Sequence, residues 1–389
     1  MNQVFRGYRR ADGGAGARNT VAVIPSVFCA NVVVEAVTRQ VINTAGILHH
    51  QGCCQLKPDL DLVTACLIGI GRNPNVGAAL IVSLGCEGVD AEEVAAGIRQ
   101  SGKPAETVYI QKGGGTVRAI AQAVQTAQEL SRQISAQPRE DTDLSHCVMS
   151  IKCGASDATS GMASNCVIGY VADRLVDLGG TVIFGETTEF IGAEHILAGR
   201  AADPACAQAI YGIVADMEAR ANRVGVDMRR GQPTPGNIQG GLTTIEEKSL
   251  GAIVKSGSRP IQGVLRYEDS AAGKRGLWIK DTPGRELEIL TGMAVAGSQC
   301  MLFSTGRGAP QGFPVMPVLK ICGNPHTFAA MPADMDVNAG EIIEGKKSIE
   351  EVGEEVLREL IAVLSGKTTK CETIGYTNLV DFYTKGPVI

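Results

Sequence analysis

Four short polar clusters in the sequence contain the side chains that could do chemistry. They occupy residues 49–55, 85–87, 152–157 and 185–195, and each follows a stretch that reads as a β-strand. Parallel strands end at the same edge of a sheet, and α/β proteins bind their ligands there. We therefore expect the clusters to contribute to a shared site, although single buried cysteines and strand-end histidines also occur in ordinary cores.

The clusters combine imidazole, thiolate and carboxylate groups. This mixture suits Fe(II), Mn(II) or Zn(II) better than calcium or magnesium. The cysteine spacing differs from the C-x-x-C pattern of a structural zinc ribbon. Two kinds of centre stay open: a single divalent metal ion, or an iron–sulfur cluster held by Cys53, Cys86 and Cys153 with one open iron. Either would act as a Lewis acid.

Several glycine-containing loops could bind an anion through their backbone N–H groups. In the third cluster, Ser156 or Asp157 could cap a helix, either as a plain structural cap or beside a bound anion. Arg307 could clamp a carboxylate with two hydrogen bonds, or it could be a surface arginine in a turn. No segment matches a P-loop or a dinucleotide fingerprint. The further candidate loops are residues 113–115, 255–258 and 305–308.

Strands and helices are expected to alternate along the chain, which predicts parallel sheets with right-handed crossovers. We predict the α/β class, with two parallel-sheet domains at residues 1–135 and 145–389, helices on both faces of each sheet, and the active site between them. The polar stretch 136–145 is the best linker candidate, and the segment 229–242 reads as a loop. Expected strands are 19–25, 46–49, 78–85, 107–111, 147–151, 181–185, 276–279, 299–304 and 315–321, and expected helices are 29–42, 60–71, 92–101, 115–134, 162–178, 205–224 and 348–365.

The composition excludes several classes of protein. The 389 residues are 44% hydrophobic and 20% charged, which is typical of a globular chain. A net charge of −5 and only 4% aromatic residues argue against a nucleic-acid binder. There is no apolar run of about 18 residues and no signal-peptide pattern, so we expect neither a membrane span nor export. The 12 cysteines are accordingly expected to be reduced thiols in a cytoplasmic protein.

The chain resembles the altronate/galactarate dehydratase family along essentially its whole length. The similarity depends on motifs that occur in the family's order, and the most characteristic are H-H-Q-G-C-C-Q, K-C-G-A-S-D-A-T-S-G and G-E-T-T-E-F-I-G-A-E. The matching segments are residues 7–19, 49–55, 73–78, 83–87, 152–161, 185–194, 233–248, 305–310 and 336–340.

The resemblance implies a hydro-lyase that dehydrates a sugar acid of the altronate or galactarate type to a 2-keto-3-deoxy acid, with Fe2+ or Mn2+. The family also has a relative in the large subunit of sulfolactate sulfo-lyase, which releases sulfite, and this is an alternative function. His49 and Cys53 favour the sugar-acid branch. Family members often carry a small SAF-type domain before the 7–19 motif, so we expect a separate small subunit or a member that works without one. A homo-oligomer is expected, and a non-catalytic subunit that contributes part of a site is a third alternative.

The implied reaction assigns roles to the residues of the motifs. A base removes the proton next to the carboxylate, an acid protonates the departing 3-hydroxyl, and the metal stabilises the enediolate. The candidate metal ligands are His49, Cys53, Cys86, Glu87, Cys153 and Glu186; the candidate acid–base groups are Lys152, Asp157, Glu189 and His195; the candidate substrate contacts are Arg18, Asn19, Asn237, Lys248 and Arg307.

Overall fold

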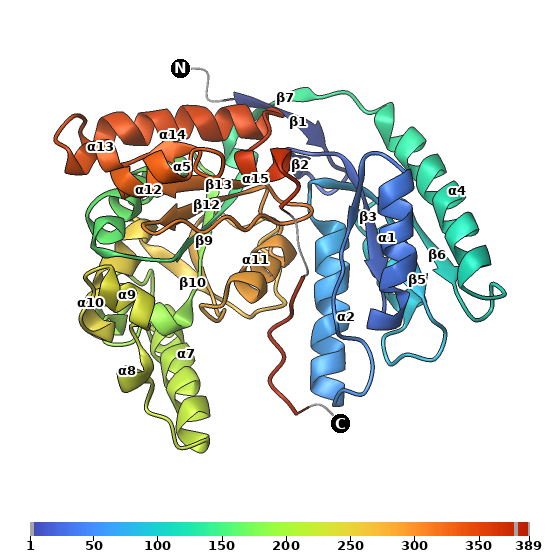
Figure 1. Ribbon diagram of the computed structural model, residues 1–389, viewed down its shortest axis with the longest axis horizontal. Coiled ribbons are helices and arrows are strands. Elements are labelled where there is room, and N and C mark those ends of the chain that lie inside the picture. The colour runs from blue at the N-terminus through green and yellow to red at the C-terminus, as the bar shows by residue number, and fades with distance from the viewer. Residues whose placement is uncertain (1–3, 377–379, 388–389) are drawn as a thin grey trace.

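The computed structural model describes residues 4–376 and 380–387, and two α/β parts lie side by side in it (Figure 1). One part contains a four-stranded parallel sheet with the strand order β4-β3-β5-β6. The other contains a seven-stranded parallel sheet with the order β10-β11-β9-β8-β12-β13-β14. The predicted α/β class with two parallel sheets is therefore confirmed.

The four-stranded sheet is covered by helices on both faces. Successive side chains of a strand point to opposite faces, so Val21 and Val23 pack with α1 and α4 whereas Ala22 and Ile24 pack with α2 and α3. The strands are β3 (Thr20–Pro25), β4 (Thr44–Gly46), β5 (Val76–Ser83) and β6 (Ala105–Tyr109), and the helices are α1 (Asn31–Gln40), α2 (Lys57–Arg72), α3 (Ala91–Arg99) and α4 (Thr116–Ser135).

The seven-stranded sheet is packed in the same way. Leu302 faces α5 (Asn165–Asp177) and α14 (Ile349–Leu364), while Met301 and Phe303 face α11 (Glu286–Val295). The strands are β8 (Val148–Gly154), β9 (Thr181–Phe184), β10 (Ile261–Leu265), β11 (Gly276–Lys280), β12 (Cys300–Thr305), β13 (Val318–Cys322) and β14 (Val337–Asn338).

One hydrophobic core joins the two sheets. Helix α11 packs against α2, so buried residues such as Leu67, Met293 and Phe303 belong to a single cluster. Because this core is continuous and apolar, the two parts hold each other in a fixed arrangement.

The segment 136–145, interpreted above as a linker, contains a strand. Strand β7 (Glu140–Asp143) pairs antiparallel with β1 (Val4–Arg9), which also pairs with β2 (Ala15–Gly16). Only Thr142 of β7 is buried. A strand that is exposed along most of its length needs no apolar alternation, so its composition does not reveal it.

The segment 229–242, interpreted as a loop, contains short helices that begin at N-capping residues. Asp227 caps the first of them, and Thr234 caps the second through a capping box with Asn237.

Of the helices in the part of the chain that the structure describes, none is both long and apolar enough for a membrane crossing. The short helices are α6 (Glu194–Ala198), α8 (Met228–Gly231), α9 (Pro235–Gln239), α10 (Ile245–Ile253), α12 (Pro325–Ala330), α13 (Gly340–Ile343) and α15 (Lys370–Thr373), and α7 (Pro204–Arg223) is longer.

Residues 380–387 return from the seven-stranded part to the four-stranded part, and Figure 1 shows this dark red segment between α11 and α2. The N–H of Val380 donates to the carbonyl of Leu48 at 2.7 Å. The N–H groups of residues 385 and 386 donate to the Asp59 carboxylate at 2.9 and 2.8 Å. The Phe382 ring meets the His49 imidazole edge to face, with their centres 5.2 Å apart.

Candidate active site

The carboxyl ends of the adjacent strands β8 and β9 carry a buried polar cluster. Cys153 lies at the end of β8, and Glu186 and Glu189 lie in the loop after β9, in and beside the short helix Thr187–Glu189. Glu186 has a φ of 70°, a left-handed conformation that turns the chain sharply after the strand. The Cys153 N–H donates to Glu186 Oε2 at 2.9 Å, and the Cys153 thiol donates to Glu189 Oε2 at 2.9 Å.

The ammonium group of Lys255 completes this cluster. Its Nζ lies 2.8 Å from Glu186 Oε2, 2.7 Å from Glu189 Oε2 and 3.1 Å from Cys153 Sγ. Lys255 is fully buried in the short helix Val254–Ser256, which follows α10. A buried ammonium needs anionic partners of this kind, because an unpaired charge in the protein interior is strongly destabilising.

A second lysine, Lys152, extends the cluster along the sheet edge. Its Nζ lies 3.6 Å from Glu186 Oε1 and 3.7 Å from Glu286 Oε1, and it donates to the Cys153 carbonyl at 2.8 Å. The same ammonium lies 4.0 Å from the centre of the Phe303 ring, which Lys320 also contacts at 3.6 Å. The cluster reaches solvent at Glu286, whose side chain is 32% exposed.

The charges in this cluster set the protonation states. Burial alone would raise the pKa of Glu189, but Lys255 and Lys248 lower it to about 2, so Glu189 is ionised. Burial and the neighbouring Glu189 raise the pKa of Glu186. Burial would lower the pKa of Lys255, but its three acidic neighbours raise it, so Lys255 carries its proton. Burial and both glutamates raise the pKa of the Cys153 thiol.

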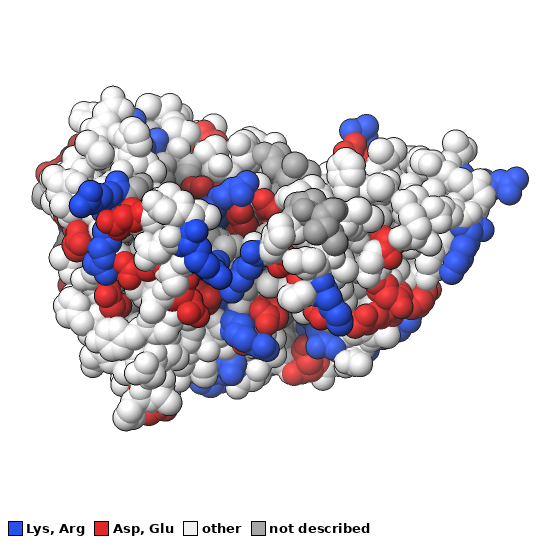
Figure 2. Space-filling model, turned by 90° about the horizontal axis from the view of Figure 1, so that it is seen from below, with Lys and Arg blue, Asp and Glu red and all other residues white. Residues whose placement is uncertain are grey.

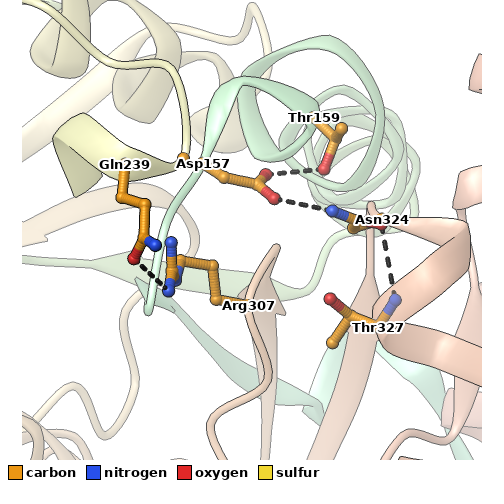
Figure 3. Close-up of a pocket in the computed structure, with 7 residues that line it drawn as sticks. Asp157, Thr159, Gln239, Arg307, Asn324 and Thr327 are labelled. Atoms are coloured by element: carbon orange, nitrogen blue, oxygen red, sulfur yellow. Dashed lines mark hydrogen bonds between the residues drawn. The ribbon is translucent and has the colours of Figure 1, made fainter. Parts of the chain in front are cut away.

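A pocket of about 420 Å³ lies on the continuation of the same loop, at the carboxyl ends of β8, β12 and β13 (Figure 3). The Asp157 carboxylate accepts hydrogen bonds from the Thr159 hydroxyl at 2.6 Å and the Asn324 amide at 3.0 Å. Arg307 Nη2 donates to Gln239 Oε1 at 3.0 Å. The lining combines one guanidinium, one carboxylate and several neutral groups, namely Thr159, Gln239, Gly240, Asn324 and Thr327.

Backbone bonds hold the loop between the cluster and the pocket. Ala155 has a φ of 48°, and its carbonyl accepts from the Arg307 N–H at 2.9 Å. The Asn237 amide donates to the Ser156 carbonyl at 2.9 Å. A Cβ at Gly306 would lie 2.0 Å from Asp157 Oδ1, so only glycine allows this turn to pack against that carboxylate. These contacts together fix the position of the Asp157 side chain at the pocket.

Of the six predicted metal ligands, the structure brings Cys153 and Glu186 together, and it adds Glu189, which we expected to be an acid–base group. Within residues 4–376 and 380–387, this trio is the one group of three side chains whose ligand atoms lie within 4.8 Å of one another in a geometry that could hold a metal ion. The site is therefore compatible with a metal cofactor.

His49 and Glu87 lie at the edge of the four-stranded sheet instead, and the protein itself satisfies them. The His49 Nε2 atom contacts the Pro25 carbonyl at 2.7 Å, and its Nδ1 accepts from the Gln51 N–H at 3.1 Å. Burial lowers the pKa of His49 to about 4. The Glu87 carboxylate accepts five hydrogen bonds, from the Ser26 and Ser83 hydroxyls and from the N–H groups of residues 84, 85 and 86.

Cys53 and Cys86 are exposed on the same edge as His49, whereas Cys153 is buried in the other part. The Cys53 Sγ atom lies 3.7 Å from that of Cys54, and the Gln111 amide lies 3.5 Å from Cys86 Sγ. The structure thus does not unite the three cysteines on which the iron–sulfur alternative depends.

The other predicted site residues lie in several different places. Lys248 Nζ lies 3.7 Å from Glu189 Oε1, so it borders the cluster. Asp157 and Arg307 line the pocket, and Asn237 bonds the Ser156 carbonyl in the loop beside it. His195 is exposed on α6. Arg18 forms a two-bond ion pair with Glu372, and Asn19 bonds Arg10 and the Ile134 carbonyl, so both hold the fold together.

Sequence reasoning missed the central position of Lys255, which it noted only within an anion-binding loop. The sequence did contain a signal for a buried charge, because this lysine directly follows the apolar run 252–254. A charged side chain at such a position must find buried partners. Glu286, Gln239, Asn324 and Thr327 were also missed, and as single polar residues near helix ends they carried no distinguishing pattern.

Two family descriptions match the chain. Residues 7–135 match the second domain of D-galactarate dehydratase/altronate hydrolase, and residues 144–386 match the C-terminal region of D-galactarate/altronate dehydratase. The chain belongs to this dehydratase family. The resemblance read from the motifs is confirmed.

The curated relatives of this family member are lyases, and so the chain is an enzyme of the lyase class. It is 37% identical to (2R)-sulfolactate sulfo-lyase subunit beta of Chromohalobacter salexigens, over 97% of both chains. It is 32% identical to altronate dehydratase of Bacillus subtilis, over 98% of this chain and 78% of the relative. It is also 32% identical to galactarate dehydratase (L-threo-forming) of Escherichia coli, over 99% of this chain and 77% of the relative.

Proposed function

We propose that the enzyme dehydrates a sugar acid of the altronate or galactarate type to a 2-keto-3-deoxy acid. The observation that carries this proposal is the buried cluster of Lys152, Cys153, Glu186, Glu189 and Lys255 next to a polar pocket, in a chain of the dehydratase family. Such a cluster offers what the elimination needs: fixed positive charge for an enediolate and groups that move protons.

The proposed roles follow from position and charge. Lys255, which keeps its proton, stabilises the negative charge that develops on the substrate carboxylate. Lys152 lies between Glu186 and Glu286. Once it has passed its own proton to the Glu286 carboxylate, its neutral amine is the candidate base that takes the proton next to the substrate carboxylate.

The pocket supports a polyhydroxylated substrate. Amide and hydroxyl groups of Gln239, Asn324, Thr159 and Thr327 can bind a chain of hydroxyls, and Arg307 can bind an anionic end. A single guanidinium with several neutral partners fits a polyhydroxylated acid with one anionic end at this pocket better than a small dianion with few hydroxyls.

We propose Fe2+ or Mn2+ as the cofactor, held by Cys153, Glu186 and Glu189. One sulfur and two carboxylate oxygens make a donor set that such ions accept. A bound divalent ion would supply Lewis-acid polarisation of the substrate carboxylate.

The proposal is tested by incubating the purified chain with altronate and galactarate, under anaerobic conditions with Fe2+ and a reductant. We expect a 2-keto-3-deoxy acid, identified by NMR and mass spectrometry, and loss of activity with a chelator. If neither these acids nor related aldonates yield a keto acid, the proposal is wrong.

A second candidate is the elimination of sulfite from a 2-hydroxy-3-sulfonate, and the match to the sulfo-lyase subunit beta over 97% of both chains favours it. The chemistry shares its first half with dehydration, because a proton next to the carboxylate is removed and the group on the next carbon departs. Release of sulfite from (2R)-sulfolactate, with the sugar acids inert, would select this function.

We further propose that the chain works with a small SAF-type subunit and assembles as a homo-oligomer. The relative's designation as subunit beta supports a partner chain. Light scattering with and without a co-expressed small subunit tests this. Full activity of the isolated chain would exclude both an obligatory partner and the reading as a non-catalytic subunit.

A further inference from the structure

Lys255 contacts all three of the side chains that could bind a metal. Its Nζ lies 2.7–3.1 Å from a donor atom of Cys153, Glu186 and Glu189. The ammonium thus makes hydrogen bonds with the same sulfur and carboxylate groups that a divalent ion would use as ligands. A lysine and a divalent ion would share one small buried space.

The two cations are poorly compatible there. The side chains of Lys255 and Glu186 are each 1% exposed, so water does little to screen a nearby second positive charge. Lys152 already adds another ammonium 3.6 Å from Glu186 Oε1. A divalent ion bound in addition to both lysines would raise the repulsion among the positive charges in this interior site.

The backbone that carries Lys255 is held firmly in place. A Cβ at Gly257 would lie 2.2 Å from Asp173 Oδ1, and a Cβ at Gly169 would lie 2.4 Å from the Val254 carbonyl. This close approach presses the short helix Val254–Ser256 against α5. Arg200 adds a hydrogen bond to the Ser256 hydroxyl at 2.9 Å. The fold therefore presents Lys255 to the trio as a built-in cation.

We propose that the Lys255 ammonium is the resident cation of the Cys153–Glu186–Glu189 trio, and that a divalent metal binds there only by displacing it. The inference deepens the proposed function at its metal site, but it holds whichever acid the enzyme uses. Lys255 then sets the metal affinity of the site.

The test is a Co2+ titration of the chelator-stripped full-length protein without substrate. A thiolate-to-cobalt charge-transfer band in the near ultraviolet reports Cys153 as a ligand. We expect Lys255→Gln to bind Co2+ with this band at least tenfold more tightly than the wild type, and Lys255→Gln/Cys153→Ser to lack the band. Lys112→Met, which removes an exposed lysine, is the control and should behave like the wild type.

Two results would overturn the proposal. One is a Cys153-dependent band in the wild type at the same Co2+ concentration as in Lys255→Gln. The other is a folded Lys255→Gln protein with no gain in affinity. If Lys255→Gln does not fold, the comparison of wild type with Cys153→Ser decides alone. A wild-type band that Cys153→Ser loses and that saturates at one equivalent of Co2+ contradicts the proposal. A band that appears only at a large excess of Co2+, or no band, supports it. Because substrate is absent, failure here is distinct from failure of the proposed dehydration.

Discussion

The edges of the two parallel sheets carry similar polar motifs but use them differently. At the four-stranded sheet, Glu87 and His49 bond mainly to backbone groups and hydroxyls in their own part. At the seven-stranded sheet, Glu186 and Glu189 face lysines from other elements. We therefore expect the first pair to be structural, whereas charges that converge from separate elements leave reactive groups facing one another.

The face shown in Figure 2 does not distinguish the two parts, because Lys, Arg, Asp and Glu side chains are mixed across both of them. Isolated surface ion pairs contribute little to stability. The comparison therefore depends on the buried groups, and the predictions below are directed at them.

The largest effect is expected at the seven-stranded edge. Lys152→Met should lower kcat about 100- to 1,000-fold, because it removes a buried ammonium 3.6 Å from Glu186. Steady-state kinetics on the identified substrate measure this. Lys103→Met is the matched control, since Lys103 is also buried but bonds only backbone carbonyls in the four-stranded part. Equal losses of kcat in both variants would remove the distinction between the edges.

Glu87→Ala should destabilise the fold by about 2–4 kcal/mol, because it leaves two hydroxyls and three N–H groups without their acceptor. The midpoint of urea unfolding measures the loss. Glu106→Ala, at an exposed position on β6, should stay within about 0.5 kcal/mol. An unchanged midpoint with lost activity would instead place Glu87 in the chemistry.

The pH dependence of stability gives a third test, at His49. Its pKa is about 4 in the folded protein and near 6.5 in the unfolded chain, so the unfolded chain binds more protons between these values. The contribution of His49 to the free energy of unfolding is complete above about pH 6.5. It falls by about 3 kcal/mol between pH 6.5 and 4, and then levels off. Urea unfolding from pH 7.5 to 4.5 should show a shallower fall for His49→Gln than for the wild type. Parallel curves would contradict the assignment.

The smallest effect is expected for the exposed thiols. Cys53→Ser and Cys86→Ser should change kcat/KM by less than about twofold, because exposed substitutions away from a site rarely matter. Iron and sulfide analysis of anaerobically purified protein accompanies the kinetics. Several irons with matching sulfide, lost in Cys86→Ser, would restore the iron–sulfur alternative and overturn the contrast between the edges.

Much of the fold was predictable because its strands are apolar and continuous. Residues 78–85 predicted β5, and 299–304 predicted β12, within two residues at each end. Helix α11 was missed because it is buried on all sides and shows no amphipathic period. Strand β7 was missed for the opposite reason, since it is almost wholly exposed and polar.

The candidate site was predictable only in part. Strand ends bring Cys153, Glu186 and Glu189 together, as the parallel topology requires. Lys255 arrives from a helix that was not predicted, so no strand-end argument could place it. From the sequence alone, His49 could not be told apart from a metal ligand. Only the structure shows that the Pro25 carbonyl faces its ring.

Residues 380–386 cover one corner of the four-stranded part. The Asp59 carboxylate is capped by the N–H groups of residues 385 and 386, and the Leu48 carbonyl pairs with Val380. A ribosome makes the His49 region early, and domains begin to fold during synthesis. This corner, however, cannot close until residues 380–386 have been synthesised and have left the exit tunnel. A nascent chain that stops before residue 380 would therefore lack the N–H groups that bond the Asp59 carboxylate and the Leu48 carbonyl, and would keep that corner open.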